Sequence, residues 1–332
     1  MLTAEGQRGN RMVKIAIIGC GQIGSRHLQS LSFLEEEAIV YLIDPSVESK
    51  KISYDRFLDI AGDSSSITVE LNCNIEDIDG NLDVAIVSTS SFDRFKNIKD
   101  LLNCNHPKYM ILEKFLFQKE EDYETVASLI SKNNIKTYVN QWVSGNYAFN
   151  RVSSLLGKIY NLEITVHGND WGLSCNSVHF IDYFDFLTGR ADLKIEKSTI
   201  DAAYRSKRMG YYEFHGVIDI VNNNKDKLKL ISSSGNCGSI FFDIINNGKK
   251  FYLELTQGSQ LIFKDCNGNV VNYHIPYQSS VTHRIVQDLL ITNECSLVEY
   301  SRSSYQHNLV LPIFDKYLRD KEGWCDSGCP IT

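Results

Sequence analysis

The most specific chemical pattern in this sequence is a run of glycines at the end of an apolar segment. Gly19-Cys20-Gly21-Gln22-Ile23-Gly24 has the form G-x-G-x-x-G, directly after the apolar run 13–18 and before a stretch with helical spacing. The first glycine of such a turn allows a tight bend, the second lets the backbone approach a pyrophosphate, and the third lets the helix pack on the strand. The helix N-terminus adds unpaired N–H groups and a partial positive charge. The hexapeptide, with Gln22 and Ile23, therefore predicts a site for a dinucleotide.

An acidic residue follows at the spacing that this kind of site requires. Asp44 ends the second apolar segment, twenty residues after Gly24, where a carboxylate meets the ribose hydroxyls of adenosine. A carboxylate there would repel a 2′-phosphate, so NAD is favoured over NADP, although the nearby Ser46 and Lys50 keep NADP open. The glycines could also form a turn in another α/β sheet, but the agreement of strand, glycines, helix and acid argues against this.

These residues are positioned by a regular alternation of elements in the first half of the chain. Short apolar runs rich in β-branched residues alternate with stretches whose apolar residues recur every three or four positions. Parallel strands need crossover connections, so this order predicts a parallel, doubly wound sheet of α/β class. The predicted strands are 13–18, 38–43, 67–73, 83–88, 109–113 and 136–140, and the later predicted helices are 48–60, 92–103 and 120–133.

The second half of the chain is rich in hairpin signals instead. Strand-like runs lie between residues 160 and 275, with turn clusters at 222–225 and 246–248. Helices are expected near 145–156 and 177–187, and two more, 280–292 and 301–318, close the chain. We expect a disordered extension over residues 1–11, an NAD-binding Rossmann domain over 12–142 and a substrate-binding α/β domain over 143–332.

Composition and the pattern of apolar residues argue against several classes of protein. Lys plus Arg is 34 and Asp plus Glu is 41, a net charge of −7, which argues against a nucleic-acid platform. No apolar run approaches the roughly 20 residues of a membrane helix, and no secretory segment follows the first Met. Nine scattered cysteines are typical of reduced thiols rather than a disulfide framework. We expect a cytoplasmic protein with no membrane or nucleic-acid partner.

Four segments resemble one enzyme family. Residues 17–28 are similar to the opening of the glucose–fructose oxidoreductase/inositol dehydrogenase (Gfo/Idh/MocA) family, and residues 83–89 to its fourth strand. Residues 111–114 resemble the strand that ends in its Glu-Lys-Pro motif, and residues 179–182 resemble its H-x-x-D signature. The resemblance covers residues 12 to about 318.

This resemblance implies a Rossmann domain followed by an α/β domain with a large, mostly antiparallel sheet. It implies transfer of a hydride between NAD(P) and a hydroxyl or carbonyl of a sugar, nucleotide sugar or cyclitol. It adds Thr89, Ser90, Glu113 and Lys114 to the cofactor side, and places Lys114, His179 and Asp182 at the catalytic positions. Dimers or tetramers are expected by analogy.

The chemistry of the three catalytic candidates agrees with this reaction. Oxidation of an alcohol needs a base for the hydroxyl proton. Histidine as a residue type titrates near neutrality, so His179 is expected to take or give that proton. A lysine beside the carbonyl oxygen stabilises developing negative charge, which suits Lys114. Asp182 shares a helix face with His179, so it is expected to orient the lysine or bind substrate.

The sequence also departs from the family pattern. Cys175 stands where an aspartate is common, Phe115 replaces the proline of Glu-Lys-Pro, and Ser90 and Arg94 replace a proline and a histidine. These departures put the substrate and part of the proton relay in doubt, while the cofactor assignment is nearly unaffected. Five residues are the candidates for binding a sugar: Asn140, Gln141, Trp171, Asn176 and His307.

Two other functions remain open on this sequence. Cys175 in the place of an aspartate favours a non-catalytic NAD-binding regulator with the same fold, whereas the intact Lys114, His179 and Asp182 argue against it. The other is a lyase or hydrolase that recycles NAD in each turnover. The run from Trp171 to Asn176 suggests enzymes of bacterial surface-sugar biosynthesis. Cys325 and Cys329 have the spacing of half a metal site but lack a second pair nearby, so no metal is expected.

Overall fold

The structure, a computed structural model, describes residues 11–62, 66–71, 74–78 and 80–332. The extension predicted over residues 1–11 lies outside these residues except for Arg11, whose guanidinium donates to the Asp83 carboxylate at 3.2 Å. The chain forms two compact units. The first contains the described residues up to Thr89 with Lys99–Ile111 and Gln278–Cys295, and the second contains Ser90–Ile98, Leu112–Tyr277 and Ser296–Thr332.

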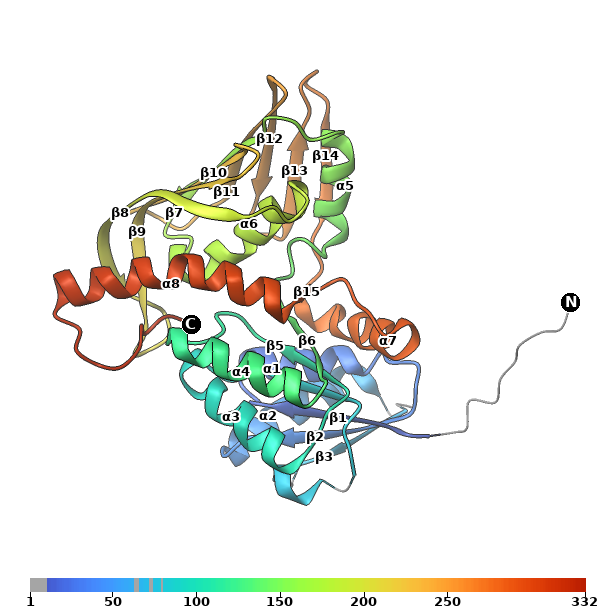
Figure 1. Ribbon diagram of the computed structural model, residues 1–332. Helices are drawn as coiled ribbons and strands as arrows, with labels where there is room; N and C mark the ends of the chain where they lie inside the picture. Colours follow the sequence, from blue (N-terminus) through green and yellow to red (C-terminus); the bar gives the residue numbers. More distant parts are fainter. Residues whose placement is uncertain (1–10, 63–65, 72–73, 79) are drawn as a thin grey trace, which may run out of the picture. The chain divides into compact units, whose positions relative to one another are not determined.

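A seven-stranded sheet has the order β15-β6-β5-β4-β1-β2-β3 (Figure 1). Strand β1 pairs in parallel with both β2 and β4, so the strand order reverses beside β1, as in doubly wound nucleotide-binding folds. The predicted Rossmann sheet is thereby confirmed. Its strands are β1 (Val13–Ile18), β2 (Ala38–Ile43), β3 (Ile67–Glu70), β4 (Val84–Val87), β5 (Tyr109–Leu112), β6 (Lys136–Val139) and β15 (Val298–Glu299).

The helices between these strands begin close to their predicted positions. They are α1 (Gln22–Leu31), α2 (Val47–Ala61), α3 (Ser91–Cys104) and α4 (Glu120–Lys132), with a 3₁₀ turn η1 (Ile75–Asp77). Ser46 caps α2 by accepting the Ser49 N–H at 3.1 Å, which explains the start of that helix. Strand β3 was predicted to reach residue 73, but the described strand ends at Glu70, and residues 72–73 lie outside the described part.

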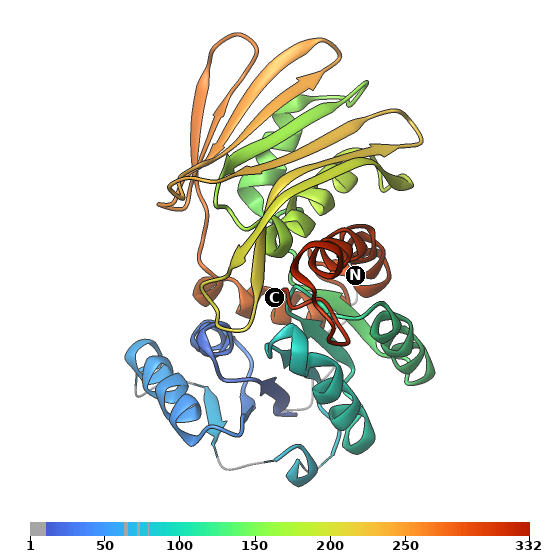
Figure 2. The same cartoon turned by 90° about the vertical axis from the view of Figure 1, so that its left-hand side faces the viewer.

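The second sheet has eight strands in the order β14-β13-β12-β11-β7-β10-β9-β8 (Figure 2). All its neighbouring pairs are antiparallel except β7 with β10. The large, mostly antiparallel sheet is therefore confirmed. Its strands are β7 (Glu163–Asn169), β8 (Leu193–Arg205), β9 (Tyr212–Asn222), β10 (Lys227–Ser233), β11 (Ile240–Asn246), β12 (Lys249–Leu255), β13 (Gln260–Lys264) and β14 (Val270–His274).

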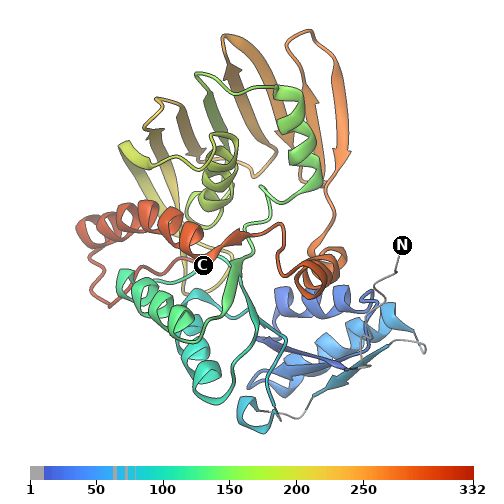
Figure 3. The ribbon, with the colours of Figure 1, turned by 45° about the vertical axis from the view of Figure 1, so that its right-hand side comes forward.

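Two helices, α5 (Tyr147–Leu156) and α6 (Leu173–Leu187), cover one face of this second sheet (Figure 3). The rings of Phe149 on α5 and Phe180 on α6 lie 6.2 and 5.2 Å from the ring of Phe242 on β11. Aromatic packing of this kind contributes beyond the area it buries. It holds α6, which carries the His179 candidate, against the second sheet.

The chain ends with α7 (Thr282–Thr292), preceded by the turn η2 (Gln278–Ser280), and with α8 (Tyr300–Glu322). Helix α8 packs against α6 within the second unit (Figure 1). Residues 140 and 141, which follow β6, also belong to this unit. The predicted domain boundary at 142 follows the last crossover strand of the first sheet and stays a prediction.

Candidate functional site

The glycine turn after β1 depends on the absence of side chains at two of its three glycines. Gly19 has a φ of +94°, and a Cβ there would lie 2.8 Å from the Thr89 nitrogen. A Cβ on Gly24 would lie 1.9 Å from the Gly19 carbonyl oxygen. Both positions therefore require glycine because of close backbone packing, as the sequence predicts for the first and third glycines.

Gly21 has open space around it, unlike Gly19 and Gly24, and this space shows whether a pyrophosphate could fit beside the turn. No described atom lies within 4 Å of a Cβ placed there. Gly21 is also the N-cap of α1, which has no side-chain cap, and Gln22 and Ile23 are exposed in its first turn. Uncapped N–H groups beside open space suit a diphosphate, so the residues present fit the cofactor.

Asp44 links the end of β2 to this turn. Its Oδ2 accepts the Cys20 N–H at 2.7 Å and its Oδ1 accepts the Ser46 N–H at 2.8 Å. A carboxylate offers about four acceptor sites, so both oxygens keep capacity for hydroxyl groups. Asp44 is therefore held in a defined orientation next to the glycine turn.

The other cofactor candidates lie at the ends of β4 and β5. Thr89 contacts the glycine turn, and its nitrogen is one of the atoms that a side chain at Gly19 would meet. Ser90 donates its hydroxyl to the Asp93 carboxylate at 2.8 Å, in the first turn of α3. Glu113 is buried and accepts from the Asn140 amide at 2.5 Å.

Lys114 is held by two neutral oxygens in the second unit. Its Nζ donates to the Cys175 carbonyl at 2.9 Å and to Asn176 Oδ1 at 3.1 Å. Asn176 in turn donates its amide to the Trp171 carbonyl at 2.6 Å. The first turn of α6 therefore orients the ammonium, and Asn176, predicted to bind substrate, contacts the lysine instead. The peptide bond from Lys114 to Phe115 is cis.

His179 lies one turn further along α6 and is 4% exposed. Burial lowers the pKa of its imidazole well below the usual value, and the nearby Lys114 and His307 act in the same direction. The imidazole is therefore neutral at neutral pH. Its Nδ1 is buried and has no hydrogen-bond partner among the described residues, so no protein group fixes the tautomer.

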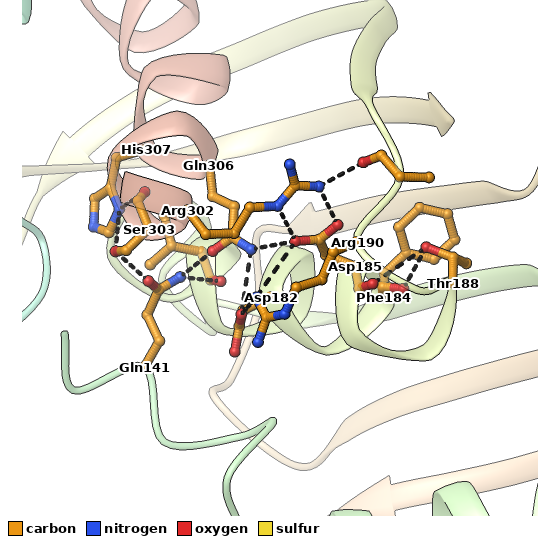
Figure 4. A network of polar contacts seen from close by, with 12 residues as sticks. Gln141, Asp182, Phe184, Asp185, Thr188, Arg190, Arg302, Ser303, Gln306 and His307 are labelled. Carbon is orange, nitrogen blue, oxygen red and sulfur yellow. Dashed lines mark hydrogen bonds and ion pairs between the residues drawn. The ribbon is translucent and has the colours of Figure 1, made fainter. Parts of the chain in front are cut away.

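Asp182 is fully buried in a polar network that joins α6 to α8 (Figure 4). Gln306 donates to Asp182 Oδ1 at 3.2 Å, and the Arg190 guanidinium lies 3.8 Å from the same oxygen. Burial raises the pKa of Asp182 to about 6, although hydrogen bonds from Ser144 and Gln306 oppose the shift. No hydrogen bond between Asp182 and Lys114 exists in the described structure, so the expected orientation of the lysine by this residue does not occur through direct contact.

The same network contains an ion pair that the sequence did not reveal. Arg302 donates from Nε and Nη2 to the two oxygens of Asp185, at 2.6 and 2.5 Å, and Nη2 also reaches the Ala191 carbonyl. Gln306 bridges Asp182 and Asp185. Asp185 lies one turn after the H-x-x-D segment, and this helical spacing is the sequence feature that could have indicated a role for it. Its partner lies more than a hundred residues later, so no local pattern indicates the pair.

Two predicted substrate residues are committed to this network. Both groups of the fully buried Gln141 amide are used: its nitrogen donates to Val178 and Gln306, and its oxygen accepts from Ser303. His307 is fully buried and donates from Nδ1 to the Ser303 carbonyl at 2.8 Å. Burial lowers the pKa of His307 to about 3, so this histidine is neutral.

The remaining two candidates are also buried. Asn140 contacts Glu113, as described above. The Trp171 indole donates to the Ile231 carbonyl at 2.7 Å and its ring packs 5.4 Å from that of Phe180. Among the five residues predicted to bind sugar, Asn176 accepts a hydrogen bond from the catalytic candidate Lys114.

Glu213 on β9 is a site-supporting residue that sequence reasoning missed. Its carboxylate accepts the Ser174 N–H at 3.0 Å and the Ser174 hydroxyl at 2.7 Å. It thereby caps the N-terminus of α6, whose own N-cap residue, Gly172, has no side chain and a φ of +78°. This is why α6 begins at Leu173, whereas the sequence predicted a start near residue 177.

Comparisons with known proteins agree with this arrangement. Residues 13–141 match the profile of an oxidoreductase family with an NAD-binding Rossmann fold, the Gfo/Idh/MocA family. These residues, which are less than half of the chain, therefore match the NAD-binding domain of that family. The resemblance found in the sequence and the assignment of a nicotinamide dinucleotide cofactor are confirmed. A comparison with curated protein sequences gives no match.

Several solved structures share the fold over nearly the whole chain. The transcriptional regulator Gal80p from Kluyveromyces lactis has a TM-score of 0.70 at 16% identity, with 94% of each chain covered. An oxidoreductase from Agrobacterium radiobacter in complex with NAD+, L-tartaric acid and magnesium has a TM-score of 0.68 at 16% identity, over 90% of this chain and 94% of the other. UDP-N-acetylglucosamine 3-dehydrogenase from Acidithiobacillus ferrooxidans has a TM-score of 0.68 at 11% identity, over 91% and 97%. At these identities the likeness shows the fold alone.

Two further observations concern other kinds of site. In the described ranges, no helix combines the length and the apolar character that crossing a bilayer requires. The same residues contain no group of three or more His, Cys, Asp or Glu side chains arranged to hold a metal ion.

Proposed function

We propose that this protein transfers a hydride between NAD and a hydroxyl or carbonyl group of a sugar, nucleotide sugar or cyclitol. The observation that carries the proposal is the pairing of Lys114 and His179 around the first turns of α6, with a neutral imidazole beside an oriented ammonium. Both residue types suit a substrate oxygen that changes between alcohol and carbonyl.

In this proposal each residue acts on one atom of the substrate. The neutral imidazole of His179 accepts the hydroxyl proton during oxidation and returns it during reduction. The ammonium of Lys114 donates a hydrogen bond to the same oxygen and stabilises negative charge that develops there. NAD, when bound, would supply the hydride acceptor for oxidation or, in its reduced form, the hydride donor for reduction. Asn176 and the Cys175 carbonyl keep the ammonium in position.

The cofactor side of the proposal assigns a role to each residue of the glycine turn and its neighbours. Gly21 and the N–H groups of Gln22 and Ile23 would hold the diphosphate, and Asp44 would accept the adenosine ribose hydroxyls. The preference for NAD over NADP rests on Asp44. Substitution Asp44→Ala should remove this preference, and an unchanged ratio of the two dissociation constants would contradict it.

The test of activity is NADH formation at 340 nm with a panel of sugars, inositols and nucleotide sugars. His179→Ala should lower turnover of any active substrate by about 10²–10⁴-fold, and Lys114→Ala should also lower it. Full activity of both variants would refute the assigned roles. Turnover without net NADH would instead favour the NAD-recycling lyase or hydrolase.

A second candidate function is a non-catalytic NAD-binding regulator. It is favoured by the fold likeness to Gal80p, described as a transcriptional regulator, and by Cys175 in the place of an acid. NAD binding with no turnover of any panel member would support it. The buried, neutral His179 argues for the enzyme, because regulation alone gives no reason to bury a titratable group beside an ammonium.

The sequence-based expectations on assembly and location belong to the same proposal. We propose a homodimer or homotetramer in a reducing, cytoplasmic compartment, and residues 12–142 and 143–332 as the two domains. Sedimentation of the purified protein in the presence of NAD measures the subunit number.

A further inference from the structure

The β8–β9 hairpin carries an unusual concentration of positive charge. Between Asp201 and Glu213 the sequence has no acidic residue but contains Arg205, Lys207 and Arg208, in a chain whose net charge is −7. All three cations are exposed, and none has an ion-pair partner among the described residues. A local excess of one sign creates a potential that attracts ligands of the opposite sign.

Aromatic rings lie among these charges. The Arg205 guanidinium is 4.3 Å from the centre of the Tyr212 ring, and that of Arg208 is 6.0 Å from the centre of the Tyr211 ring. Arg208 also donates to the Thr332 hydroxyl at 3.0 Å. A guanidinium stacked on a ring loses less freedom when it binds an anion, because part of its orientation is already set.

The end of the hairpin extends beyond its neighbour in the sheet. Strand β9 pairs with β8 from Tyr212 onward but with β10 only from Gly216 to Val221 (Figure 2). Among the described residues, that side of the hairpin end has no strand partner, and its Tyr212 N–H donates to the Pro330 carbonyl at 2.8 Å. Its turn is closed by the Ser206 N–H, which donates to the Tyr211 carbonyl at 2.9 Å.

The base of the hairpin lies next to the groups assigned to catalysis. Tyr204 pairs across the sheet with Glu213, Glu213 caps Ser174, and the next residue, Cys175, accepts the Lys114 ammonium. The Tyr204 ring is also stacked 4.5 Å from that of His215, whose Nε2 lies 2.6 Å from Asp170. The cationic turn therefore begins at Arg205, one residue after Tyr204. Tyr204 is connected to Lys114 through its strand partner Glu213 and the first turn of α6.

We propose that the turn with Arg205, Lys207 and Arg208 binds the diphosphate of a nucleoside diphosphate sugar whose sugar reacts at Lys114 and His179. Guanidinium groups bind phosphate oxygens in pairs, and the tyrosine rings supply faces on which a base can stack. The proposal deepens the proposed function by naming the substrate class, and it rests on that function. The net negative charge of the chain argues against nucleic acid as the ligand.

The experiment is calorimetric titration of UDP and TDP into the full-length protein saturated with NAD+, which occupies the cofactor site. We expect binding that weakens as salt increases. In Arg205→Ala/Lys207→Ala/Arg208→Ala the affinity should fall at least about 30-fold, since hydrogen bonds to charged groups are the strong ones. Substitution of three exposed lysines of the same sheet, Lys249→Ala/Lys250→Ala/Lys264→Ala, removes equal charge and should leave the affinity within about twofold.

Titration of other phosphate-containing ligands distinguishes a nucleotide site from a site for any phosphate group. Inorganic pyrophosphate and glucose 1-phosphate should bind at least about tenfold more weakly than UDP, because they lack the base. Equal binding of UDP and glucose 1-phosphate would overturn the nucleotide assignment, as would a short RNA that binds more tightly than UDP. Failure of UDP and TDP to bind, or equal UDP affinity in the triple variant, would overturn the site itself.

Failure of this inference is distinguishable from failure of the proposed function. If the protein binds NAD+ and oxidises a nucleoside diphosphate sugar with the same kcat/KM in the wild type and in the Arg205/Lys207/Arg208 variant, the hairpin site is wrong and the oxidoreductase stands. If NAD+ does not bind, the proposed function fails first.

Discussion

At the residue scale, the orientation of Lys114 depends on neutral acceptors. Its ammonium contacts the Cys175 carbonyl and the Asn176 amide oxygen, and Asn176 is itself fixed by the Trp171 carbonyl. A carbonyl and an amide fix direction without adding a formal charge. These two contacts therefore orient Lys114 toward the role proposed for it, a hydrogen bond to a substrate oxygen.

Loss of the amide at Asn176 should misplace this ammonium. We predict that Asn176→Ala lowers kcat by about 10–100-fold, since small displacements of a catalytic group are costly, while NAD affinity is unchanged. Asn176→Asp, which retains an oxygen at the same place, should recover part of the loss. An exposed asparagine of the β9–β10 turn provides the control, Asn223→Ala. Wild-type kcat in Asn176→Ala would show that the contact has no positioning role.

Asp182 allows a prediction about pH. Its pKa is raised to about 6 in the folded protein from an ordinary value of 3.8, so the folded state binds more protons than the unfolded state between these pH values. Stability contributed by this group is therefore present below about pH 4 and is lost as pH rises to about 6. The ionised form costs on the order of 2–3 kcal/mol at neutral pH.

Asp182→Asn removes this titration and can still accept the hydrogen bond from Gln306. We predict that the variant is about as stable as the wild type, or less stable, at pH 4.5, and gains relative to the wild type at pH 7.5. Urea denaturation at the two pH values measures the difference. A stability difference that does not change with pH would contradict the raised pKa.

At the scale of elements, the start of α6 positions two groups of the candidate site. Its first turn accepts hydrogen bonds from Lys114, and His179 follows one turn later. Gly172 provides the left-handed bend, and a Cβ there would lie 2.8 Å from Cys175 Sγ and 3.1 Å from Asn176 Nδ2. The cap comes from Glu213 on β9. A helix capped by a distant strand is held against that strand, so the sheet positions the first turn of α6, which contacts Lys114.

Removal of this cap should weaken the element without abolishing the fold. Glu213→Ala leaves the Ser174 N–H and hydroxyl without their carboxylate and should cost about 1–3 kcal/mol. The measurement is the urea midpoint, with an unchanged m-value as the sign that the fold is retained. Glu196→Ala, on an exposed position of β8, is the matched control and should change stability little. Equal midpoints for the two variants would mean that Glu213 is not a functional cap.

Elements with a strong local period were predictable, and those stabilised by distant partners were not. Strands β1 and β2 match their predicted bounds because each is a short, almost entirely apolar run, which only Lys14 interrupts. Strand β8 extends to Arg205 although its residues after Asp201 lack an apolar pattern, because pairing with β9 holds them. Strand β13 is short and lies between turns, and the two residues of β15 join the first sheet only through pairing with β6.

At the scale of the molecule, the sequence predicted a site best where its residues lie close together in the chain. The glycine turn and Asp44 are such a case, because strand, turn and helix follow one another. The network of Gln141, Asp182, Ser303 and Gln306 joins segments that lie far apart in the chain (Figure 4). Gln141 was predicted as a ligand of substrate from its place in the loop after the sixth strand, and His307 from a position that resembles the border of the family's substrate pocket. Their internal partners are not visible in the sequence.

Cofactor binding should change the thermal stability of the whole protein. A ligand at a hundred times its dissociation constant stabilises the folded state by about 2.7 kcal/mol, so NAD+ should raise the melting temperature of the wild type. Gly21 offers a way to remove this effect without changing the fold. Its φ of −69° suits any residue, and no described atom lies near its missing Cβ.

We therefore predict that Gly21→Val melts at the wild-type temperature without ligand and shows no stabilisation by NAD+, because the side chain occupies the space needed by the diphosphate. Gly24→Ala is the contrasting variant. Its Cβ would lie 1.9 Å from the Gly19 carbonyl oxygen, so this protein should melt lower even without ligand. Differential scanning calorimetry of the three proteins, with and without NAD+, gives both quantities. If Gly21→Val were stabilised by NAD+ as much as the wild type, the diphosphate would have to bind elsewhere in the chain.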